Sequence, residues 1–368
     1  MRTIGITGAS GFIGWHLRAF LSCQKAVNQI LVDENDFVDQ RLLIEKVDQC
    51  SVIVHLAGMN RGDERKIYIT NVGLTKKLIG ACETAKVKPH IIFISSVHRN
   101  RKTAYGRSKK ESEKLLRAWA KKNKTIVTNL ILPNVFGEYG RPFYNSAVAT
   151  FCYQLARGEQ PKIISDSTIK LVYVQKVAEI IFSFIKKPRH IDFKVSGESF
   201  KISNLLLILL KLKNDYFNNI IPSFRKPIER NLFNTLRSYF FETPNFFPKI
   251  FELKNDARGS LFEMLKHHSA GQFFASTTKP GAVRGNHYHT RKFERFAVIQ
   301  GKAEIALRRI LTDKVIRFKV NGNQPVFVDM PTFYTHNIKN IGRKNLLTLF
   351  WSDEIFNPAD ADTYQEKV

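Results

Sequence analysis

The chain has 368 residues, more than an ordinary single domain, so we expect two folded units. Hydrophobic residues make up 43% of it and charged residues 24%, a balance that excludes intrinsic disorder and fibrous repeats. The longest apolar run, Ile202–Leu212, is too short to cross a bilayer, and the first residues lack the pattern of a secretion signal. We therefore expect a cytoplasmic protein with no membrane span.

The chain carries a net charge of +26, which attracts anions without choosing among nucleic acid, anionic lipid and phosphorylated metabolites. No aromatic and basic pattern of recognised spacing accompanies this charge. We therefore favour a solvated, lysine-rich surface over a nucleic-acid partner. The cysteines form no CxxC pair, which fits a reducing compartment; they are Cys23, Cys50, Cys82 and Cys152.

The first half of the chain alternates short apolar strands with amphipathic helices. The expected strands are residues 3–7, 30–32, 52–56, 91–95 and 126–132. The expected helices between them are residues 13–21, 71–85 and 109–122. This alternation predicts an α/β domain with a doubly wound parallel sheet of the Rossmann type, covered by helices on both faces. A smaller lobe is expected from helices over residues 147–157, 177–185 and 205–212.

The pattern changes after residues 242–250, where Pro244 and Pro248 stand among aromatic residues and mark the best domain boundary. Beyond it, short β-type runs alternate with Gly, Asn or Pro turns. These runs are residues 272–276, 296–300, 302–307, 315–320, 326–329 and 345–351. They predict an all-β sandwich or small barrel. We therefore expect one domain over residues 1–243 and a second over residues 244–368.

A glycine-rich turn follows the first expected strand, and its three glycines are spaced three residues apart at the start of a helix. Glycine lets the backbone approach a pyrophosphate, whose charge the helix N-terminus favours. An acidic residue at the end of the second strand, about 20 residues farther on, is placed to contact a ribose hydroxyl. The turn therefore predicts a dinucleotide site. Its expected contacts are Gly8, Ser10, Gly11, Phe12, Ile13, Gly14 and Asp33.

Tyr105 and Lys109 are four residues apart on an expected helix, so they share one face of it, and Ser96 precedes them at the end of the fourth strand. A lysine ammonium beside a phenol favours the phenolate, so we expect a lowered pKa of Tyr105. The phenol would pass its proton to a carbonyl that receives hydride, while Ser96 hydrogen-bonds the same oxygen. Alone, such a pair also fits an ordinary helix surface. The glycine turn and the strand-end serine favour catalysis.

Together these residues resemble the extended short-chain dehydrogenase/reductase family over about residues 1–240. The resemblance includes His55-Leu56-Ala57-Gly58 after the third strand. It implies a nicotinamide coenzyme contacted by His55, Leu56 and Ala57 as well as by Tyr105 and Lys109. Members commonly act on nucleotide sugars. Substrate contacts are therefore expected at Ser96, Asn134, Asn145 and Ser146.

The second half of the chain holds four side chains of the metal-ligand type. His287 and His289 point to the same side of a strand, Glu294 follows on a neighbouring strand, and His336 lies after a later turn. Three nitrogens and one carboxylate suit zinc, with iron, manganese or nickel as alternatives. From residue 251 onward the spacing resembles both motifs of the cupin superfamily, except that Phe333 stands where the second motif usually has glycine. A purely structural metal stays an alternative.

The two halves together resemble the bifunctional capsular-polysaccharide enzymes that process a UDP-2-acetamido-2,6-dideoxy-4-hexulose, a UDP-4-keto-6-deoxy-N-acetylhexosamine. The resemblance implies that the cupin domain inverts carbon 3 and that the reductase domain then reduces the ketone at carbon 4. The product would be UDP-2-acetamido-2,6-dideoxy-L-talose, a precursor of UDP-N-acetyl-L-fucosamine. A homodimer is also implied. The sequence does not assign the base for the inversion; Tyr334 is a candidate, whereas His336 serves better as a ligand.

The family is associated with NADPH, but Asp33 and Glu34 stand where the coenzyme's 2′-phosphate would lie. An acidic side chain there hydrogen-bonds a free hydroxyl and repels a phosphate, which predicts that NADH is accepted at least as well as NADPH. Two other functions stay open. One is a plain 4-ketosugar reductase with a structural cupin, and the other is a non-catalytic NAD sensor that binds nucleic acid. The intact Tyr105 and Lys109 argue against the sensor.

Overall fold

The structure is a computed structural model that describes residues 2–25, 27–244, 250–324 and 326–368. The chain folds into two compact units, Met1–Leu210 with Lys226–Pro244, and Lys211–Arg225 with Asn245–Val368. This division differs from the predicted one for residues 211–225, because β10 (Ile220–Ile221) pairs with β12 (Gly259–His267) of the second unit. Residues 245–249 of the predicted boundary segment, Pro248 among them, lie outside the described residues.

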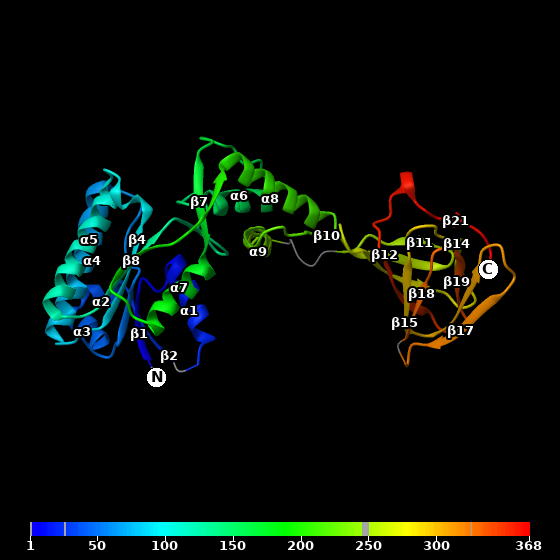
Figure 1. Ribbon diagram of the computed structural model, residues 1–368, viewed down its shortest axis with the longest axis horizontal. Coiled ribbons are helices and arrows are strands. Elements are labelled where there is room, and N and C mark those ends of the chain that lie inside the picture. Colours follow the sequence, from blue (N-terminus) through cyan, green and yellow to red (C-terminus); the bar gives the residue numbers. More distant parts are fainter. Residues whose placement is uncertain (1, 26, 245–249, 325) are drawn as a thin grey trace. The chain divides into compact units, whose positions relative to one another are not determined.

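A parallel sheet forms the centre of the first unit and confirms the predicted Rossmann-type fold (Figure 1). In the described part of the chain the strand order is β2-β1-β3-β4-β5-β8. These strands are β1 (Arg2–Thr7), β2 (Val27–Val32), β3 (Val52–His55), β4 (His90–Ser96), β5 (Val127–Leu132) and β8 (Ile191–Lys194). The order changes direction between β1 and β3, which is the point where a doubly wound sheet binds its ligand.

Helices cover both faces of this sheet because the buried strands carry apolar side chains on both sides. On one face α1 (Phe12–Ser22) and α7 (Val174–Lys186) pack around Ile6, Leu17 and Ile181. The other face is covered by α2 (Glu34–Val38), α3 (Gln40–Asp48), α4 (Glu64–Thr84) and α5 (Ala104–Asn123). The helix predicted at residues 177–185 for the smaller lobe is α7, so it belongs to the sheet instead.

The lobe contains a small sheet of order β6-β7-β9 and further helices. Its elements are β6 (Asn134–Phe136), β7 (Thr168–Tyr173), β9 (Glu198–Lys201), α6 (Ala147–Ala156), α8 (Ile202–Phe217) and α9 (Pro227–Phe241). The short helix η1 (Val97–Asn100) follows β4. Within the described ranges, no helix combines the length and the apolar character that crossing a bilayer requires.

From residue 250 onward the described part of the second unit is built of β-strands and one short 3-10 helix, in line with the predicted all-β domain, and its strands form two sheets. The end of α8, from residue 211, also belongs to this unit. One has the order β10-β12-β13-β20-β15-β18 with β11 beside β12, and the other has the order β17-β16-β19-β14-β21. The remaining bounds are β11 (Lys254–Asp256), β13 (Gly271–Thr278), β14 (Val283–Tyr288), β15 (Glu294–Gln300), β16 (Lys302–Arg309), β17 (Val315–Asn321), β18 (Val326–Met330), β19 (Tyr334–Asn340), β20 (Leu346–Ser352), η2 (Pro358–Asp360) and β21 (Tyr364–Gln365).

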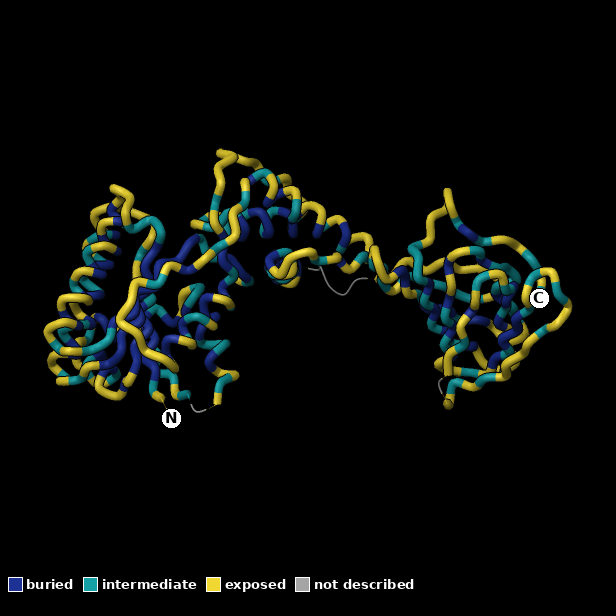
Figure 2. The backbone as a smooth tube through the Cα atoms, viewed as in Figure 1, coloured by how far each residue is buried: buried dark blue, intermediate teal, exposed yellow. Residues whose placement is uncertain are grey.

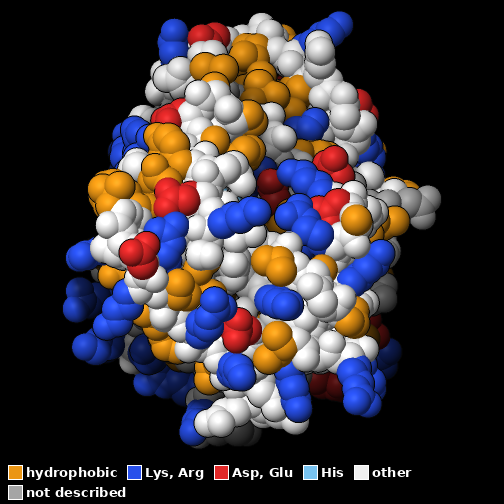
Figure 3. Space-filling model, turned by 90° about the vertical axis from the view of Figure 1, so that its right-hand side faces the viewer, with side chains coloured by type: hydrophobic (Ala, Val, Ile, Leu, Met, Phe, Trp, Pro, Cys, Tyr) orange, Lys and Arg blue, Asp and Glu red, His pale blue; other side chains and the backbone are white. Residues whose placement is uncertain are grey.

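Alternating side chains of the two sheets bury a common apolar core in the second unit. Phe296 and Phe350 come from one sheet and Ile305 and Ile338 from the other, and all are at most 5% exposed. Figure 2 shows the buried residues gathered inside each unit. On the face seen in Figure 3, Lys and Arg side chains are dispersed with Asp and Glu among them. This dispersal is typical of a solvated charged surface.

Candidate functional site

The predicted dinucleotide turn joins β1 to α1 and lies beside the end of β3. Gly8 has a φ of 66°, and a side chain there would bring its Cβ to 2.8 Å from the Ala57 nitrogen. A Cβ at Gly14 would collide with the Gly8 carbonyl oxygen, so both positions require glycine. No described side chain caps the first N–H groups of α1. These N–H groups suit an anion such as a pyrophosphate.

The segment after β3 is tied to the same turn by Thr7. Its Oγ1 accepts hydrogen bonds from Leu56 N and Ala57 N, both at 3.1 Å, and lies 2.8 Å from His55 Nδ1. On its other side, His55 Nε2 lies 3.3 Å from Thr75 Oγ1. Burial lowers the pKa of His55 to about 3, so its ring is neutral. The imidazole therefore supports the turn, while Leu56 and Ala57 border the glycines.

Asp33 stands at the end of β2 and also begins α2. Its Oδ1 accepts hydrogen bonds from Asn35 N at 2.9 Å and Asp36 N at 3.4 Å, and Asp36 Oδ2 accepts one from Asp33 N at 2.7 Å. This reciprocal capping box fixes an exposed carboxylate at the predicted ribose position. Lys46 pairs with Asp36 at 2.7 Å and stabilises the arrangement. The sequence analysis did not anticipate this capping role.

The structure brings Ser96, Tyr105 and Lys109 together at the end of β4 and the start of α5. The side chain of Ser96 hydrogen-bonds Tyr105. Lys109 Nζ lies 5.7 Å from the centre of the Tyr105 ring and donates a hydrogen bond to Ile94 O at 2.8 Å. The helical spacing of four residues and the position of the serine therefore place the three predicted groups in one site.

The predicted lowering of the Tyr105 pKa is wrong for this structure. Burial raises the pKa of Tyr105, and only the hydrogen bond with Ser96 opposes the rise. Burial also lowers the pKa of Lys109 to about 8, although Glu113 acts in the opposite direction. Both shifts have the same physical cause, because desolvation disfavours a charge. Tyr105 therefore holds a proton that it can donate, and Lys109 stays charged below about pH 8.

The predicted substrate residues other than Ser96 have local partners. Ser146 caps α6, since its Oγ accepts a hydrogen bond from Ala149 N at 3.2 Å. Asn134 begins β6, and its Nδ2 donates to Lys170 O at 3.2 Å. Asn145 precedes the Ser146 cap. These contacts explain why the residue types suit their positions, and they leave substrate contact as a prediction.

Two exposed arginines beside Tyr144 were missed by the sequence analysis. Arg61 donates hydrogen bonds to the carbonyl oxygens of Phe143 and Tyr144, and the Arg141 guanidinium lies 5.1 Å from the centre of the Tyr144 ring. Guanidinium groups suit the phosphates of a nucleotide sugar. No sequence signal distinguishes these arginines, because the whole chain is basic.

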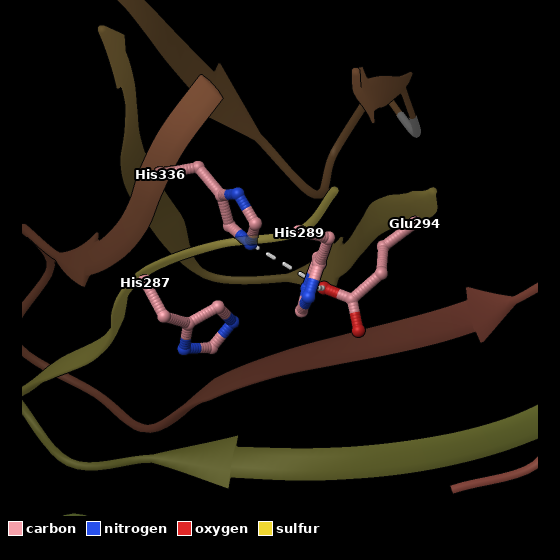
Figure 4. A group of neighbouring side chains, drawn as sticks. All are labelled: His287, His289, Glu294 and His336. Atoms are coloured by element: carbon pink, nitrogen blue, oxygen red, sulfur yellow. Dashed lines mark ion pairs between the residues drawn. The ribbon is translucent and has the colours of Figure 1, made fainter. Parts of the chain in front are cut away.

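The four predicted metal ligands converge inside the second unit (Figure 4). One ligand atom from each of His287, His289, Glu294 and His336 lies within 4.8 Å of the others. Glu294 Oε2 is 3.4 Å from Nε2 of both His289 and His336. His287 lies near the end of β14 and His289 just after it, Glu294 begins β15, and His336 lies in β19; these strands belong to both sheets. Folding therefore completes a donor set that is scattered along the chain.

The donor set fits a divalent metal ion. His289 Nε2 and His336 Nε2 are buried, and apart from their 3.4 Å ion pairs with Glu294 Oε2 neither has a hydrogen-bond partner among the described residues. Such orphaned atoms are costly unless a ligand satisfies them. Burial lowers the pKa of His287 to about 4, which keeps its imidazole neutral and able to bind a metal. Burial alone would raise the pKa of Glu294, but His289 and His336 hold it well below its usual range.

Backbone carbonyls orient two of the imidazoles. His336 Nδ1 donates to Tyr334 O at 3.1 Å, and His289 Nδ1 donates to Asp362 O at 2.6 Å. Each bond turns Nε2 toward the other ligands. Tyr334 is partly buried against the apolar core and its carbonyl accepts the bond from His336, while the role of its hydroxyl as a base stays a prediction. Asp362 was not predicted from the sequence, because no motif connects it to His289.

Phe333 replaces the usual glycine without losing the turn. Its φ is 61°, in the left-handed region, and its backbone N donates to His289 O at 2.7 Å while its carbonyl accepts from Ile310 N at 3.0 Å. This conformation costs a non-glycine residue about 1–2 kcal/mol. The flanking hydrogen bonds hold it in place. The departure from the cupin motif therefore leaves the approach to His336 intact.

Two family models match the chain. Residues 4–202 match the NAD dependent epimerase/dehydratase family. Residues 254–364 match the polysaccharide biosynthesis C-terminal domain. The first match covers the parallel sheet and the Ser96, Tyr105 and Lys109 group, and the second covers the metal-ligand cluster.

Relatives and solved structures extend the likeness over the whole chain. The UDP-2-acetamido-2,6-beta-L-arabino-hexul-4-ose reductase of Pseudomonas aeruginosa is 31% identical over 364 residues, which cover 98% of this chain and 97% of that protein. The crystal structure of the capsular polysaccharide assembling protein CapF from Staphylococcus aureus has a TM-score of 0.90 and 32% identity, and the match covers 99% of this chain and 100% of that one. The structure of RMD from Pseudomonas aeruginosa, complexed with NADPH, shares the fold alone, with a TM-score of 0.57, 18% identity and coverage of 66% and 100%.

Proposed function

This chain belongs to the NAD dependent epimerase/dehydratase family, and on that premise we propose that it is a bifunctional nucleotide-sugar enzyme. The second unit inverts carbon 3 of a UDP-2-acetamido-2,6-dideoxy-4-hexulose, and the first unit then reduces the carbon 4 ketone. The product is UDP-2-acetamido-2,6-dideoxy-L-talose, a precursor of UDP-N-acetyl-L-fucosamine. The observation that carries the proposal is the meeting of Ser96, Tyr105 and Lys109 in a chain that aligns end to end with a hexul-4-ose reductase.

In the first unit, Gly8, Gly11 and the N-terminus of α1 would hold the coenzyme pyrophosphate. When bound, NADH or NADPH supplies a hydride to the substrate carbon. Tyr105 donates its proton to the ketone oxygen, and Ser96 positions that oxygen by a hydrogen bond. Lys109 then stabilises the phenolate that remains, since its ammonium is charged below about pH 8 and lies beside the ring.

The coenzyme preference follows from Asp33. Its carboxylate is exposed at the end of β2 and is fixed by the capping box with Asp36. A fixed anion at this point accepts a hydrogen bond from a free ribose hydroxyl and repels a 2′-phosphate. We therefore propose that NADH is used at least as well as NADPH.

In the second unit, His287, His289, Glu294 and His336 would hold a divalent ion, zinc in our proposal. When bound, the ion supplies a Lewis acid beside the ketone, where negative charge develops as carbon 3 loses its proton. That proton is acidic because carbon 3 is adjacent to the carbonyl, and a proton returned to the opposite face of carbon 3 completes the inversion. Tyr334 stays the proposed base. Replacing it by Phe should stop proton exchange at carbon 3 and, because reduction follows the inversion, should also lower formation of the L-talo product.

The deciding experiment is incubation of the 4-ketosugar with each coenzyme in deuterated water, followed by NMR of the products. Deuterium at carbon 3 reports epimerisation, and loss of the keto signal reports reduction. Tyr105→Phe should retain the first and lose the second. Its matched control is Tyr139→Phe, since Tyr139 is 55% exposed and should leave both unchanged.

Two outcomes would favour the alternative functions, a plain 4-ketosugar reductase or an NAD sensor that binds nucleic acid. Reduction by the unaltered protein without deuterium at carbon 3 would indicate a plain 4-ketosugar reductase with a structural metal. Salt-sensitive DNA binding without ketosugar turnover would indicate a sensor.

The proposed assembly is a homodimer, as the resemblance to the bifunctional enzymes implies. Ile69 on α4 is 59% exposed and lines a surface hollow of about 750 Å³ together with Tyr68 and with Arg107 of α5. The hollow is otherwise lined by charged side chains of α4 and α5, and we propose it as the contact between the two copies. Ile69→Asp should lower the dimer fraction in analytical ultracentrifugation. An unchanged monomeric mass for both proteins would contradict the assembly.

A further inference from the structure

The C-terminal segment, defined as Ala361–Lys367, contacts the chain around all three predicted histidine ligands. Gln365 of β21 pairs with His287 of β14, and Glu366 N donates to Asn286 O at 3.0 Å. Thr335, the neighbour of His336, donates its hydroxyl hydrogen bond to Glu366 O. At the other end of the segment, Asp362 O accepts the bond from His289 Nδ1 at 2.6 Å. The segment therefore runs past every histidine of the cluster.

Asp362 makes the densest set of these contacts. Its carboxylate accepts hydrogen bonds from three consecutive backbone N–H groups, those of Thr290, Arg291 and Lys292, each at 3.0 Å. The Thr290 hydroxyl adds a fourth bond at 2.6 Å. These residues form the loop between the ligands His289 and Glu294. Asp362 thus fixes one ligand by its carbonyl and the adjoining loop by its carboxylate.

The conformation and burial of Asp362 show that this contact is tightly determined. The residue is 5% exposed and has a φ of 41°, in the left-handed region that costs a non-glycine residue free energy. Further bonds fasten the same loop, since Lys292 Nζ donates to Ala361 O at 2.7 Å and Arg291 pairs with Glu354 and Asp360. A strained residue persists only where its surroundings hold it, as these bonds do.

We propose that Asp362 is a positioning residue of the metal centre, which it preorganises by fixing the tautomer of His289 and the path of the loop to Glu294. This inference rests on the proposed metal site. A histidine ligand donates its second N–H to a fixed acceptor, which orients the ring and raises its basicity; loss of such a partner typically costs 10–100-fold in metal affinity. A segment that merely closes the fold would instead change stability and leave metal affinity unaltered.

The test measures zinc affinity of the full-length protein by competition with a chromophoric chelator, with the unaltered chain, Asp362→Ala and Asp362→Asn. Asp362→Ala keeps the backbone carbonyl that accepts from His289 but removes the carboxylate that holds residues 290–292 and the carbonyl in place. We therefore expect it to bind zinc about 10-fold more weakly, at the lower end of the range for loss of a ligand's partner. Asp362→Asn keeps one neutral acceptor oxygen, so its zinc affinity should lie between that of the unaltered chain and that of Asp362→Ala. The matched control is Asp329→Ala, which removes an exposed carboxylate of the same unit that pairs with Arg295 and contacts none of the ligands.

A second variant covers failure of Asp362→Ala to fold, which far-UV circular dichroism would reveal. Thr290→Val removes only the hydroxyl bond to Asp362 and should weaken zinc binding by a few-fold. If folded Asp362→Ala and Thr290→Val bind zinc as tightly as the unaltered chain, Asp362 is no positioning residue. Zinc binding by the unaltered chain is measured first. If that chain binds no zinc, the proposed metal site itself is refuted.

Discussion

Replacing Lys109 by methionine should make the free protein more stable at neutral pH while abolishing reduction. Lys109 is 7% exposed, and burial lowers its pKa from 10.5 to about 8. A shift of one pKa unit is equivalent to about 1.4 kcal/mol. The lowered pKa of Lys109 therefore means that keeping its ammonium charged in this site costs about 3 kcal/mol. Methionine keeps the length and apolar stem of lysine without the charge. It also forgoes the hydrogen bond to Ile94 O, so the net gain is about 1–2 kcal/mol.

The pH dependence of the free energy of unfolding tests independently whether the buried charge of Lys109 destabilises the protein. The pKa of Lys109 is lower in the folded chain than in the unfolded chain, so between about pH 8 and 10.5 the unfolded chain binds the extra proton. Stability of the unaltered protein therefore rises with pH across this window. The advantage of Lys109→Met should be largest below pH 8 and should disappear by about pH 10.5.

Urea unfolding followed by tryptophan fluorescence measures both effects, since Trp15 and Trp119 lie in the first unit. The matched control is Lys114→Met, which replaces an exposed lysine of the same helix and should change stability by no more than a few tenths of a kcal/mol. A cost of burying the ammonium is refuted if Lys109→Met is no more stable than the unaltered protein at pH 7. A gain that stays the same at pH 7 and pH 10 would refute it equally, because the ammonium would then not be its cause.

Three further outcomes are expected. NADH should be oxidised at least as fast as NADPH at equal sub-saturating concentrations, and Asp33→Ala should raise NADPH use by removing the repelling carboxylate. The rate of reduction should fall above about pH 8, where Lys109 loses its proton, as a pH profile of kcat would show. Removing the metal with a chelator, or replacing His289 by Ala, should stop deuterium incorporation at carbon 3 and, because reduction follows the inversion, should also lower formation of the L-talo product.

A specific result would contradict each of these three predictions. A much faster oxidation of NADPH than of NADH would contradict the role given to Asp33. A reduction rate that is flat from pH 7 to 10 would remove Lys109 from the mechanism, because its pKa lies inside that range. Unchanged deuterium incorporation after chelation would assign carbon 3 chemistry to groups other than the metal ligands.

Local sequence patterns were enough to predict the elements and most of the candidate residues. The glycines after β1 and the Tyr105 and Lys109 spacing depend on only a few neighbouring residues, so periodicity and turn chemistry reveal them. The His287 and His289 pair likewise reflects the two-residue repeat of a strand. His336 lies far along the chain, and only resemblance to a known motif joined it to the others.

Only the folded chain decided what depends on burial or on distant contacts. Burial reverses the expected direction of the Tyr105 pKa, because desolvation cannot be read from a spacing of four residues. Packing placed α7 against the parallel sheet, and the hydrogen bond from His289 to Asp362 joins residues 73 positions apart. A sequence records which groups are neighbours along the chain, whereas solvent exclusion and long-range hydrogen bonds arise only when the chain closes on itself.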